Sequence, residues 1–205
     1  MGDLDGTSPL RAVGTNRKAV VHTSHFSEQG GFYMPPFTIR LACGDDLREI
    51  NSIYNEAVLN TTATFDLEIR ELQSARAWYH AHGPAYPIFV AEENAQVIGW
   101  SSLSPFAPRP AYRFTAEDSI YIHQDFRGRG AGGALLRALL EAADALGYKA
   151  IIAKIAEHNE VSLALHHRAG FIMAGTLQSV GYKFGRWIDL DLLQRLLPAH
   201  PEELS

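Results

Sequence analysis

The residues with the clearest chemical meaning form a glycine-rich loop, Arg127-Gly128-Arg129-Gly130-Ala131-Gly132. The loop follows a strand-like apolar run, 119–122, and precedes a helical run of leucine and alanine, 134–140. A helix that begins in glycines exposes unpaired backbone N–H groups at the positive end of its dipole, and without Cβ atoms a diphosphate can approach them closely. The two arginines add cations that reach phosphate oxygens. The loop therefore predicts a site for a ligand that carries a pyrophosphate.

Two classes of phosphate ligand fit this loop. Residues 128–133 contain the G-x-G-x-x-G spacing of NAD(P)-binding proteins, whereas Arg127-x-x-Gly130-x-Gly132 resembles the pyrophosphate loop of GNAT-type N-acetyltransferases, which hold acetyl-CoA. In a dinucleotide-binding unit the strand runs almost directly into the first glycine, but here residues 123–127 intervene. Arginines inside the loop also suit a ligand with extra phosphate charge. These observations favour an acyl-CoA, and a helix cap without a ligand is the remaining alternative.

The composition is that of an ordinary globular protein. Of 205 residues, 46% are hydrophobic and 20% are charged, which suits one domain with a substantial core. The formal net charge of −5 and the lack of a Lys/Arg-rich block argue against nucleic-acid binding. Because Cys43 is the only cysteine and no apolar run is long enough to span a membrane, we expect a cytoplasmic protein. The nine histidines lack metal-binding spacing, so we expect no metal.

The hydrophobic pattern divides the chain into three parts. Residues 1–36 lack periodicity, and we expect a disordered extension or an upstream artefact there. Residues 37–197 alternate between strand-like and helix-like periods, and residues 198–205 form a C-terminal tail. The pattern predicts the order βααβββαβαββ, an α+β fold in which a mixed sheet is flanked by helices. The predicted strands are 37–41, 88–92, 96–100, 119–122, 150–153, 171–174 and 187–193, and the predicted helices begin near Asp45 or Asp46, Leu72, Ala134 and Asn159.

Several strings of residues resemble the GNAT acetyltransferase superfamily and, within it, the phosphinothricin N-acetyltransferases. That subgroup includes enzymes that acetylate methionine sulfoximine and methionine sulfone. The resemblance spans about residues 37–193 and includes the element order and the glycine-rich loop. The other matching strings are Tyr54-Asn55-Glu56-Ala57-Val58, Asn60-Thr61-Thr62-Ala63, Thr115-Ala116-Glu117, Asn159 with 165–171, and Lys183-Phe184-Gly185-Arg186-Trp187-Ile188-Asp189-Leu190.

The resemblance implies the GNAT acyl-CoA N-acyltransferase fold and direct transfer of an acetyl group from acetyl-CoA to an amine. The expected acceptor is the α-amine of a small amino acid or glutamate-like analogue. Glu117, just before the strand 119–122, is then the expected general base, acting through water on the substrate ammonium. Its neighbour Asp118 is expected to be solvated. His166 is either an acid that protonates the CoA thiolate or a structural histidine of its helix.

The resemblance also implies which residues bind the two substrates. Relatives often carry a basic residue where this chain has Ala107; either Arg109 supplies that charge from a neighbouring position or the substrate differs. Asn159 fits both a contact with the pantetheine amides and a helix cap. The expected acetyl-CoA contacts are Ile120, Tyr121, Ile122, Arg127, Gly128, Arg129, Gly130, Ala131, Gly132 and Asn159, and the expected amine-substrate contacts are Thr61, Phe65, Arg109 and Tyr112.

Two other functions stay open from the sequence. The chain could be a CoA-binding regulatory module without turnover, or, on the dinucleotide interpretation, an NAD(P)-dependent oxidoreductase. The resemblance implies a homodimer that acts on a small-molecule amine. The net charge and the lack of a membrane-length apolar run predict no nucleic-acid or membrane partner.

Overall fold

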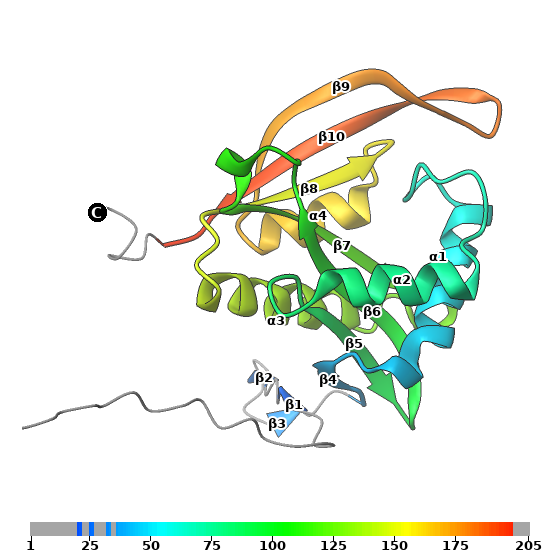
Figure 1. Cartoon of the computed structure of the whole chain (residues 1–205), viewed down its shortest axis with the longest axis vertical. Coiled ribbons are helices and arrows are strands. Elements are labelled where there is room, and N and C mark those ends of the chain that lie inside the picture. The colour runs from blue at the N-terminus through cyan, green and yellow to red at the C-terminus, as the bar shows by residue number, and fades with distance from the viewer. Residues whose placement is uncertain (1–19, 22–24, 27–31, 34–35, 199–205) are drawn as a thin grey trace, which may run out of the picture.

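The computed structural model of the chain describes residues 20–21, 25–26, 32–33 and 36–198 (Figure 1). Most of the predicted extension, 1–36, and residues 199–205 of the predicted tail lie outside the described residues. From β4 onward the elements follow the predicted order βααβββαβαββ, which is confirmed. The elements are β1 (Val20–Val21), β2 (His25–Phe26), β3 (Phe32–Tyr33), β4 (Thr38–Leu41), η1 (Gly44–Asp46), α1 (Leu47–Asn60), α2 (Leu72–His82), β5 (Ile88–Glu93), β6 (Gln96–Pro105), η2 (Pro110–Tyr112), β7 (Thr115–Ile122), η3 (Gln124–Phe126), α3 (Ala131–Ala145), β8 (Ala150–Ala156), α4 (Glu160–Arg168), β9 (Ile172–Lys183) and β10 (Arg186–Leu196).

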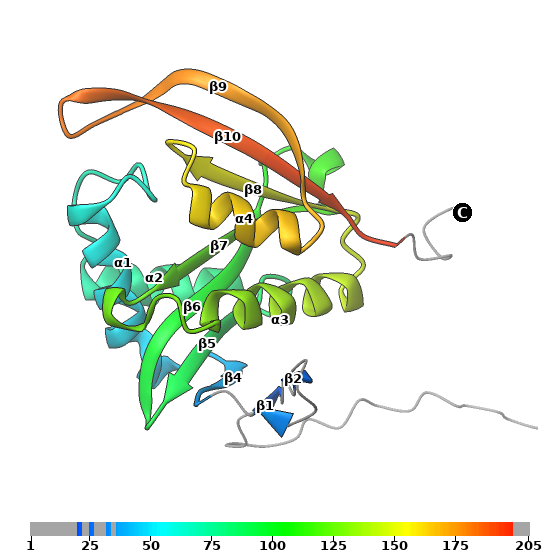
Figure 2. The ribbon, with the colours of Figure 1, turned by 180° about the vertical axis from the view of Figure 1, so that it is seen from behind.

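The main sheet has the order β1-β4-β5-β6-β7-β8-β10-β9, and β2 pairs separately with β3. Within the described part of the chain, the main-sheet strands pair antiparallel except at the parallel β7–β8 pair. The helices α1 and α2 cover one face, and α3 and α4 cover the other, as the two opposite views show (Figures 1 and 2). This is the expected α+β architecture, a mixed sheet between two helical layers.

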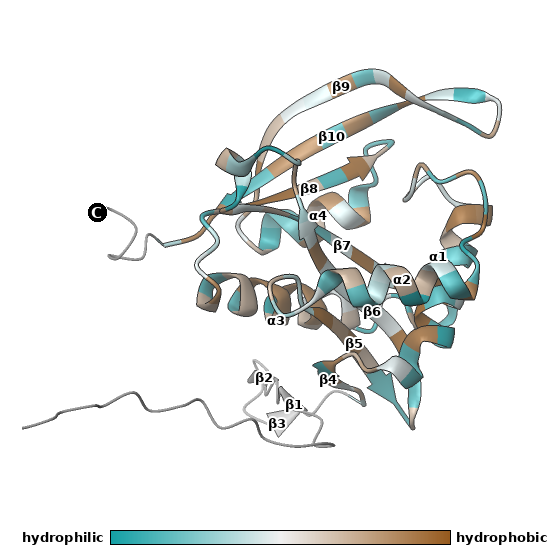
Figure 3. Ribbon diagram, in the orientation of Figure 1, coloured by the Kyte–Doolittle hydropathy of each residue, from teal (hydrophilic) through white to brown (hydrophobic). Residues whose placement is uncertain are grey.

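Each face of the sheet has its own hydrophobic core. On the α3 face, Leu135 and Leu139 pack with Leu103 and Ile151, and all four side chains are fully buried. On the α1 face, Ile50 and Trp100 belong to a second cluster. Figure 3 shows the apolar colouring along β5 and β6, between the helical layers. The helices form because apolar residues recur at helical spacing and bury one side of each helix against the sheet.

Several strands are longer than the sequence predicts. The strand β7 begins at Thr115, so Glu117 lies inside the strand and not just before it. The strand β9 extends to Lys183, although prediction ends it at residue 174. Most β9 side chains are exposed, so the strand lacks the apolar alternation that marks a half-buried strand. Backbone pairing with β10, and not the side-chain pattern, maintains β9.

The strands β7 and β8 pair at one end and then diverge. Their register joins Thr115, Ala116 and Glu117 to Ala150, Ile151 and Ile152, and no further pair is recorded between them within the described chain. The strand β7 nevertheless continues beside β6 to its end, and β8 continues beside β10. Because both strands stay paired on their outer sides, the gap between residues 118–122 and 153–156 is part of the fold. The helices α3 and α4 begin at this open end.

Candidate active site

The glycine-rich loop connects the open end of β7 to the start of α3. The N–H of His123 donates to the carbonyl of Ile98 at 2.9 Å, which anchors the chain before the loop. Gly128 has φ +76° and Gly130, the N-cap of α3, has φ +88°. L-residues rarely adopt this left-handed conformation, so both positions favour glycine. A Cβ atom on either glycine would meet no atom within 4 Å, so the space beside these two positions is open.

The two loop arginines are half exposed, and each has an acidic neighbour within the protein. Arg127 Nη2 lies 3.4 Å from Glu56 Oε1, and Arg129 Nη1 lies 3.6 Å from Glu93 Oε2. Arg127 Nε also donates to the carbonyl of Ile122 at 3.1 Å. Because these pairs are long and their guanidinium groups are half exposed, they contribute little to stability, so both groups can turn toward an anionic ligand at small cost.

A cavity of about 660 Å³ extends from the loop between α3 and α4. This volume is typical of small-molecule sites. Gly130 and Gly133 line the cavity, together with Arg137, Arg168 and Arg195. Sequence reasoning missed these three arginines. Arg137 lies four residues after Gly133, so the helical period alone would have placed it on the same side of α3.

Glu117 forms an ion pair across the line where β7 and β8 separate. Its Oε2 lies 2.6 Å from Nζ of Lys154 on β8, and the side chains are 23% and 36% exposed. Glu117 and Tyr121 are four residues apart on one strand and therefore point to the same face, that of α1 and α2. Sequence reasoning missed Lys154, because only the register of β8 against β7 places it beside Glu117.

Asp118 points to the opposite face, where it pairs with His166 of α4. The prediction that Asp118 is solvated is wrong, because Asp118 is 7% exposed and His166 is 4% exposed. The Nε2 atom of His166 lies 3.0 Å from Asp118 Oδ2, and its Nδ1 lies 2.7 Å from the carbonyl oxygen of Ser162. A carbonyl and an ionised carboxylate only accept hydrogen bonds, so this geometry favours an imidazole that carries a proton on both ring nitrogens.

The pKa of His166 reflects this pairing. Burial lowers the pKa, but the hydrogen bond and charge of Asp118 outweigh burial, and the pKa is raised above its ordinary value. Both ring nitrogens are engaged inside the protein. This geometry favours the structural alternative for His166, and its role as an acid stays a prediction.

Two predicted substrate residues lie in the α1–α2 loop, and contacts within the protein hold both. The hydroxyl of Thr61 donates to the carbonyl of Ala57 at 2.8 Å, at the end of α1. Phe65 lies directly over Gly181 of β9, where a Cβ atom would come within 2.5 Å of the ring. Lys183 Nζ donates to a carbonyl of the same loop at 2.8 Å. The α1–α2 loop and the β9–β10 hairpin are therefore joined into one surface.

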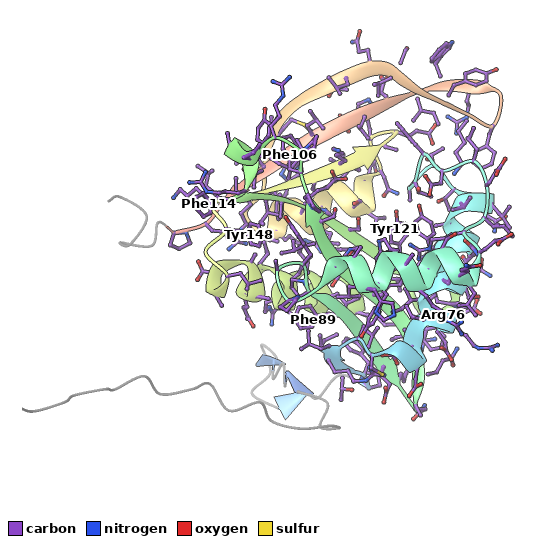
Figure 4. The ribbon with its side chains drawn as sticks, viewed as in Figure 1. Arg76, Phe89, Phe106, Phe114, Tyr121 and Tyr148 are labelled. Atoms are coloured by element: carbon purple, nitrogen blue, oxygen red, sulfur yellow. The ribbon has the colours of Figure 1, made fainter. Side chains whose placement is uncertain are left out.

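The other two predicted substrate residues follow β6. Tyr112 is 42% exposed, and its ring meets Phe106 edge to face with centroids 5.3 Å apart. Arg109 is exposed; its carbonyl accepts a hydrogen bond from the N–H of Tyr112 at 3.0 Å, but its side chain has no hydrogen bond or ion pair with the residues that the structure describes. Figure 4 shows Phe106 on the segment between β6 and β7. A contact with a neighbouring ring thus positions the side chain of Tyr112, whereas no recorded polar contact among the described residues positions that of Arg109.

The side chain of Tyr121 belongs to an aromatic cluster under α1 and α2 (Figure 4). Its ring stacks on Trp100 at 4.8 Å and meets Tyr54 edge to face at 5.4 Å. Burial, followed by the charge of Tyr54, raises the pKa of Tyr121. Arg70 lies over the Tyr54 ring at 4.5 Å. With the side chain fixed in this cluster, the backbone of residues 120–122 forms one edge of the gap between β7 and β8.

Asn159 occupies the N-cap position of α4. Its Oδ1 accepts a hydrogen bond from the N–H of Ser162 at 3.0 Å, as the cap interpretation predicts. The cap also places Asn159 at the open end of β8, where a contact with a ligand in the gap stays a prediction.

Among the residues that the structure describes, no cluster of three or more His, Cys, Asp or Glu side chains could hold a metal ion. Within the same ranges, no helix is both long and apolar enough to cross a bilayer.

The sequence and the structure of this chain are similar to those of known acetyltransferases. Residues 47–171 match the Acetyltransferase (GNAT) family. The L-methionine sulfoximine/L-methionine sulfone acetyltransferase of Pseudomonas paraeruginosa is 42% identical over 159 residues, which cover 77% of this chain and 92% of that protein. The phosphinothricin N-acetyltransferase of Alcaligenes faecalis is 40% identical and covers 79% of this chain and 83% of its own length. A phosphinothricin acetyltransferase from Sinorhizobium meliloti, solved with acetyl-CoA, superposes with a TM-score of 0.77 at 40% identity, covering 79% of this chain and 89% of that one.

Proposed function

Because the chain belongs to the GNAT family of acetyl-CoA-dependent N-acetyltransferases, we propose that it acetylates the α-amine of a small amino acid. The proposed acceptors include glutamate-like analogues of the phosphinothricin, methionine sulfoximine and methionine sulfone type. Two relatives that are at least 40% identical have names that specify such acceptors. Family membership favours turnover over a CoA-binding regulatory module and over an NAD(P)-dependent oxidoreductase.

The observation that carries this proposal is the gap between β7 and β8, with the glycine-rich loop at its open end and Glu117 where the gap begins. The residues present fit acetyl-CoA, because two left-handed glycines border open space at the start of a long helix. Backbone N–H groups there can bind a pyrophosphate. The unpaired edge of residues 120–122 can bind an extended chain such as pantetheine by strand-like hydrogen bonds.

Glu117 is the proposed base. A carboxylate has an intrinsic pKa far below that of an amine, so we propose that a water molecule relays the ammonium proton to Glu117. The amide of Ile120, at the edge of the gap, is the proposed hydrogen-bond donor to the thioester oxygen. Acetyl-CoA supplies the activated acetyl group, and the protein aligns the amine with it.

Replacing Gly130 by Ala tests the proposed pyrophosphate site. A left-handed L-residue costs about 1–2 kcal/mol, so we expect the start of α3 to rearrange and the Kd of CoA to rise roughly tenfold. Calorimetric titration with CoA measures the effect. The matched control is Gly83→Ala at the end of α2, which replaces another glycine of positive φ, +56°, beside open space. Equal affinities for CoA in the two variants would contradict the proposed site.

Thiol release from acetyl-CoA tests the proposed reaction. We expect phosphinothricin, methionine sulfoximine or methionine sulfone to exceed ordinary amino acids in kcat/KM by about tenfold or more, since one well-placed polar contact contributes about 1.5–3 kcal/mol when a charge is involved. Equal weak rates for every compound would reject this acceptor class and leave only acetyl transfer.

We further propose a homodimer and a cytoplasmic location. The support for a dimer is β9, the edge strand of the sheet, because an exposed apolar edge strand tends to pair with another chain. A second copy of the chain is the proposed partner, and light scattering of the purified protein would give its mass. The exposed large apolar side chains of the β9–β10 hairpin are Ile172, Met173, Leu177, Val180, Tyr182, Phe184, Trp187 and Leu196.

A further inference from the structure

Lys154 has no part in the function proposed above, yet it lies beside the proposed base. It is two residues beyond Ile152, the last β8 residue that pairs with β7, so it points to the same face as Glu117. The two side chains meet at 2.6 Å and both are partly exposed. The pair therefore presents one anion and one cation to whatever molecule enters the gap from the α1–α2 face.

This pair of charges is complementary to an α-amino acid. A free amino acid carries an ammonium and a carboxylate on the same carbon, and the proposed reaction brings the ammonium to Glu117. The carboxylate then lies within reach of the lysine that already contacts Glu117. We infer that Lys154 binds the α-carboxylate of the substrate, so that Glu117 and Lys154 together recognise the zwitterion and not a bare amine. The inference rests on the proposed function.

The surroundings of Lys154 support this role. Its Nζ lies 5.8 Å from the centroid of the Phe106 ring, and Phe106 packs against Tyr112, a predicted substrate contact. Ala107 follows Phe106 and carries no charge, and the exposed side chain of Arg109 has no polar partner among the described residues. Lys154 is thus a cation that faces this segment from a strand. A strand positions a side chain more rigidly than a loop does.

The ammonium group of Lys154 is suited to contact two carboxylates at the same time. It is a point charge on a flexible stem with three donors, so it can bind the substrate carboxylate and keep Glu117 as a neighbour. The substrate ammonium and carboxylate would add to the Glu117–Lys154 pair with alternating charges. An amine without a carboxylate, such as an amino-acid amide or a peptide N-terminus, would reach Glu117 but leave Lys154 without its new partner.

The test compares one amino acid with its α-carboxamide in wild-type and Lys154→Met protein. The amino acid is the panel compound with the highest kcat/KM, for which L-methionine sulfone is expected. We expect the variant to lose roughly 10- to 100-fold in kcat/KM for the acid, mainly through KM, because a charge-assisted contact is removed. We expect the amide to change less than about threefold. The two compounds differ in amine pKa, but this difference is the same for both proteins and cancels when the acid-to-amide ratio of the variant is divided by that of wild type.

Two further variants separate recognition from structure. Lys154→Arg should retain most of the preference for the acid, since it keeps the charge. Lys149→Met removes a lysine just before β8, where Nζ contacts only the carbonyl of Leu197 among the residues described, and should leave the ratio unchanged. If Lys154→Met is unfolded by melting temperature, Lys154→Gln gives the same comparison. Equal losses for acid and amide, or no loss for either, would overturn the inference. Absence of thiol release by wild-type protein would instead reject the proposed function.

Discussion

Glu117→Gln should lower kcat/KM for the amino-acid acceptor by about 10²- to 10⁴-fold, the range that general base catalysis contributes. Glutamine keeps the size of the side chain and a hydrogen-bond acceptor, but it cannot take a proton from the attacking amine. The loss should appear in kcat and in the KM for the amine, whereas the KM for acetyl-CoA should change little, because the acetyl-CoA contacts proposed for residues 120–122 and 127–132 are backbone or basic groups that the substitution leaves in place. Steady-state thiol release gives kcat and KM, and calorimetry with CoA gives the affinity.

The control is Glu49→Gln, which neutralises an exposed carboxylate on α1. It should leave kcat/KM within about twofold, because a surface charge far from the reacting groups has a small effect. Glu117→Gln also removes the anion paired with Lys154, so the melting temperatures of both variants are needed. A loss below tenfold in a folded Glu117→Gln protein would show that another group or bulk water accepts the proton.

Asp118→Asn should destabilise the fold by about 3–5 kcal/mol, the cost of leaving one partner of a buried ion pair alone. His166 would keep its hydrogen bond to the carbonyl of Ser162 but lose the carboxylate that stabilises its positive charge. For a chain of this size the loss corresponds to a melting temperature lower by about 10 °C. Urea unfolding and calorimetry both measure it. The control is Asp125→Asn, which breaks the exposed pair between His123 and Asp125 and should have almost no effect.

The same substitution should change how stability depends on pH. The folded pKa of His166 is raised above 6.5, the value of an unperturbed histidine. A group with a raised folded pKa binds its proton more tightly in the native state, so its contribution is fully present below about pH 6.5 and declines as pH rises through the folded pKa. The stability difference between wild type and Asp118→Asn should therefore be largest below about pH 6.5 and shrink at higher pH. A difference that stays constant across this range would contradict the cationic state of His166.

Local patterns in the sequence predict much of this fold. The glycine-rich loop, the apolar period of α3 and the Asn159 cap each depend on residues close together in the chain. The structure has the cap where prediction places it, but α3 begins at Ala131 and not near Ala134, so Ala131 and Gly132 of the predicted loop form its first turn. The order of elements follows because each carries its own period or breaker. The limits of β9 do not, since its exposed side chains carry little alternation.

The polar pairs of the site depend on register and could not be predicted. Whether Asp118 faces solvent or α4 is decided by a one-residue difference in strand phase, and the sequence around it contains Glu117, Asp118 and Ser119 with no apolar alternation. The partnership of Glu117 with Lys154 likewise requires the alignment of two strands separated by the whole of α3. Local spacing carries no information about that alignment.

Because β7 and β8 diverge, the sheet consists of two parts that are joined where residues 115–117 pair with residues 150–152. Farther along, each part exposes main-chain donors and acceptors that an uninterrupted sheet would satisfy itself. A ligand bound between the diverging strands would supply hydrogen-bond partners as an additional strand would, and those partners would be lost again when the ligand dissociates. Ligand binding should therefore also stabilise the sheet. Substitutions that weaken ligand binding between β7 and β8 should then also reduce the rigidity of the whole sheet in the bound state.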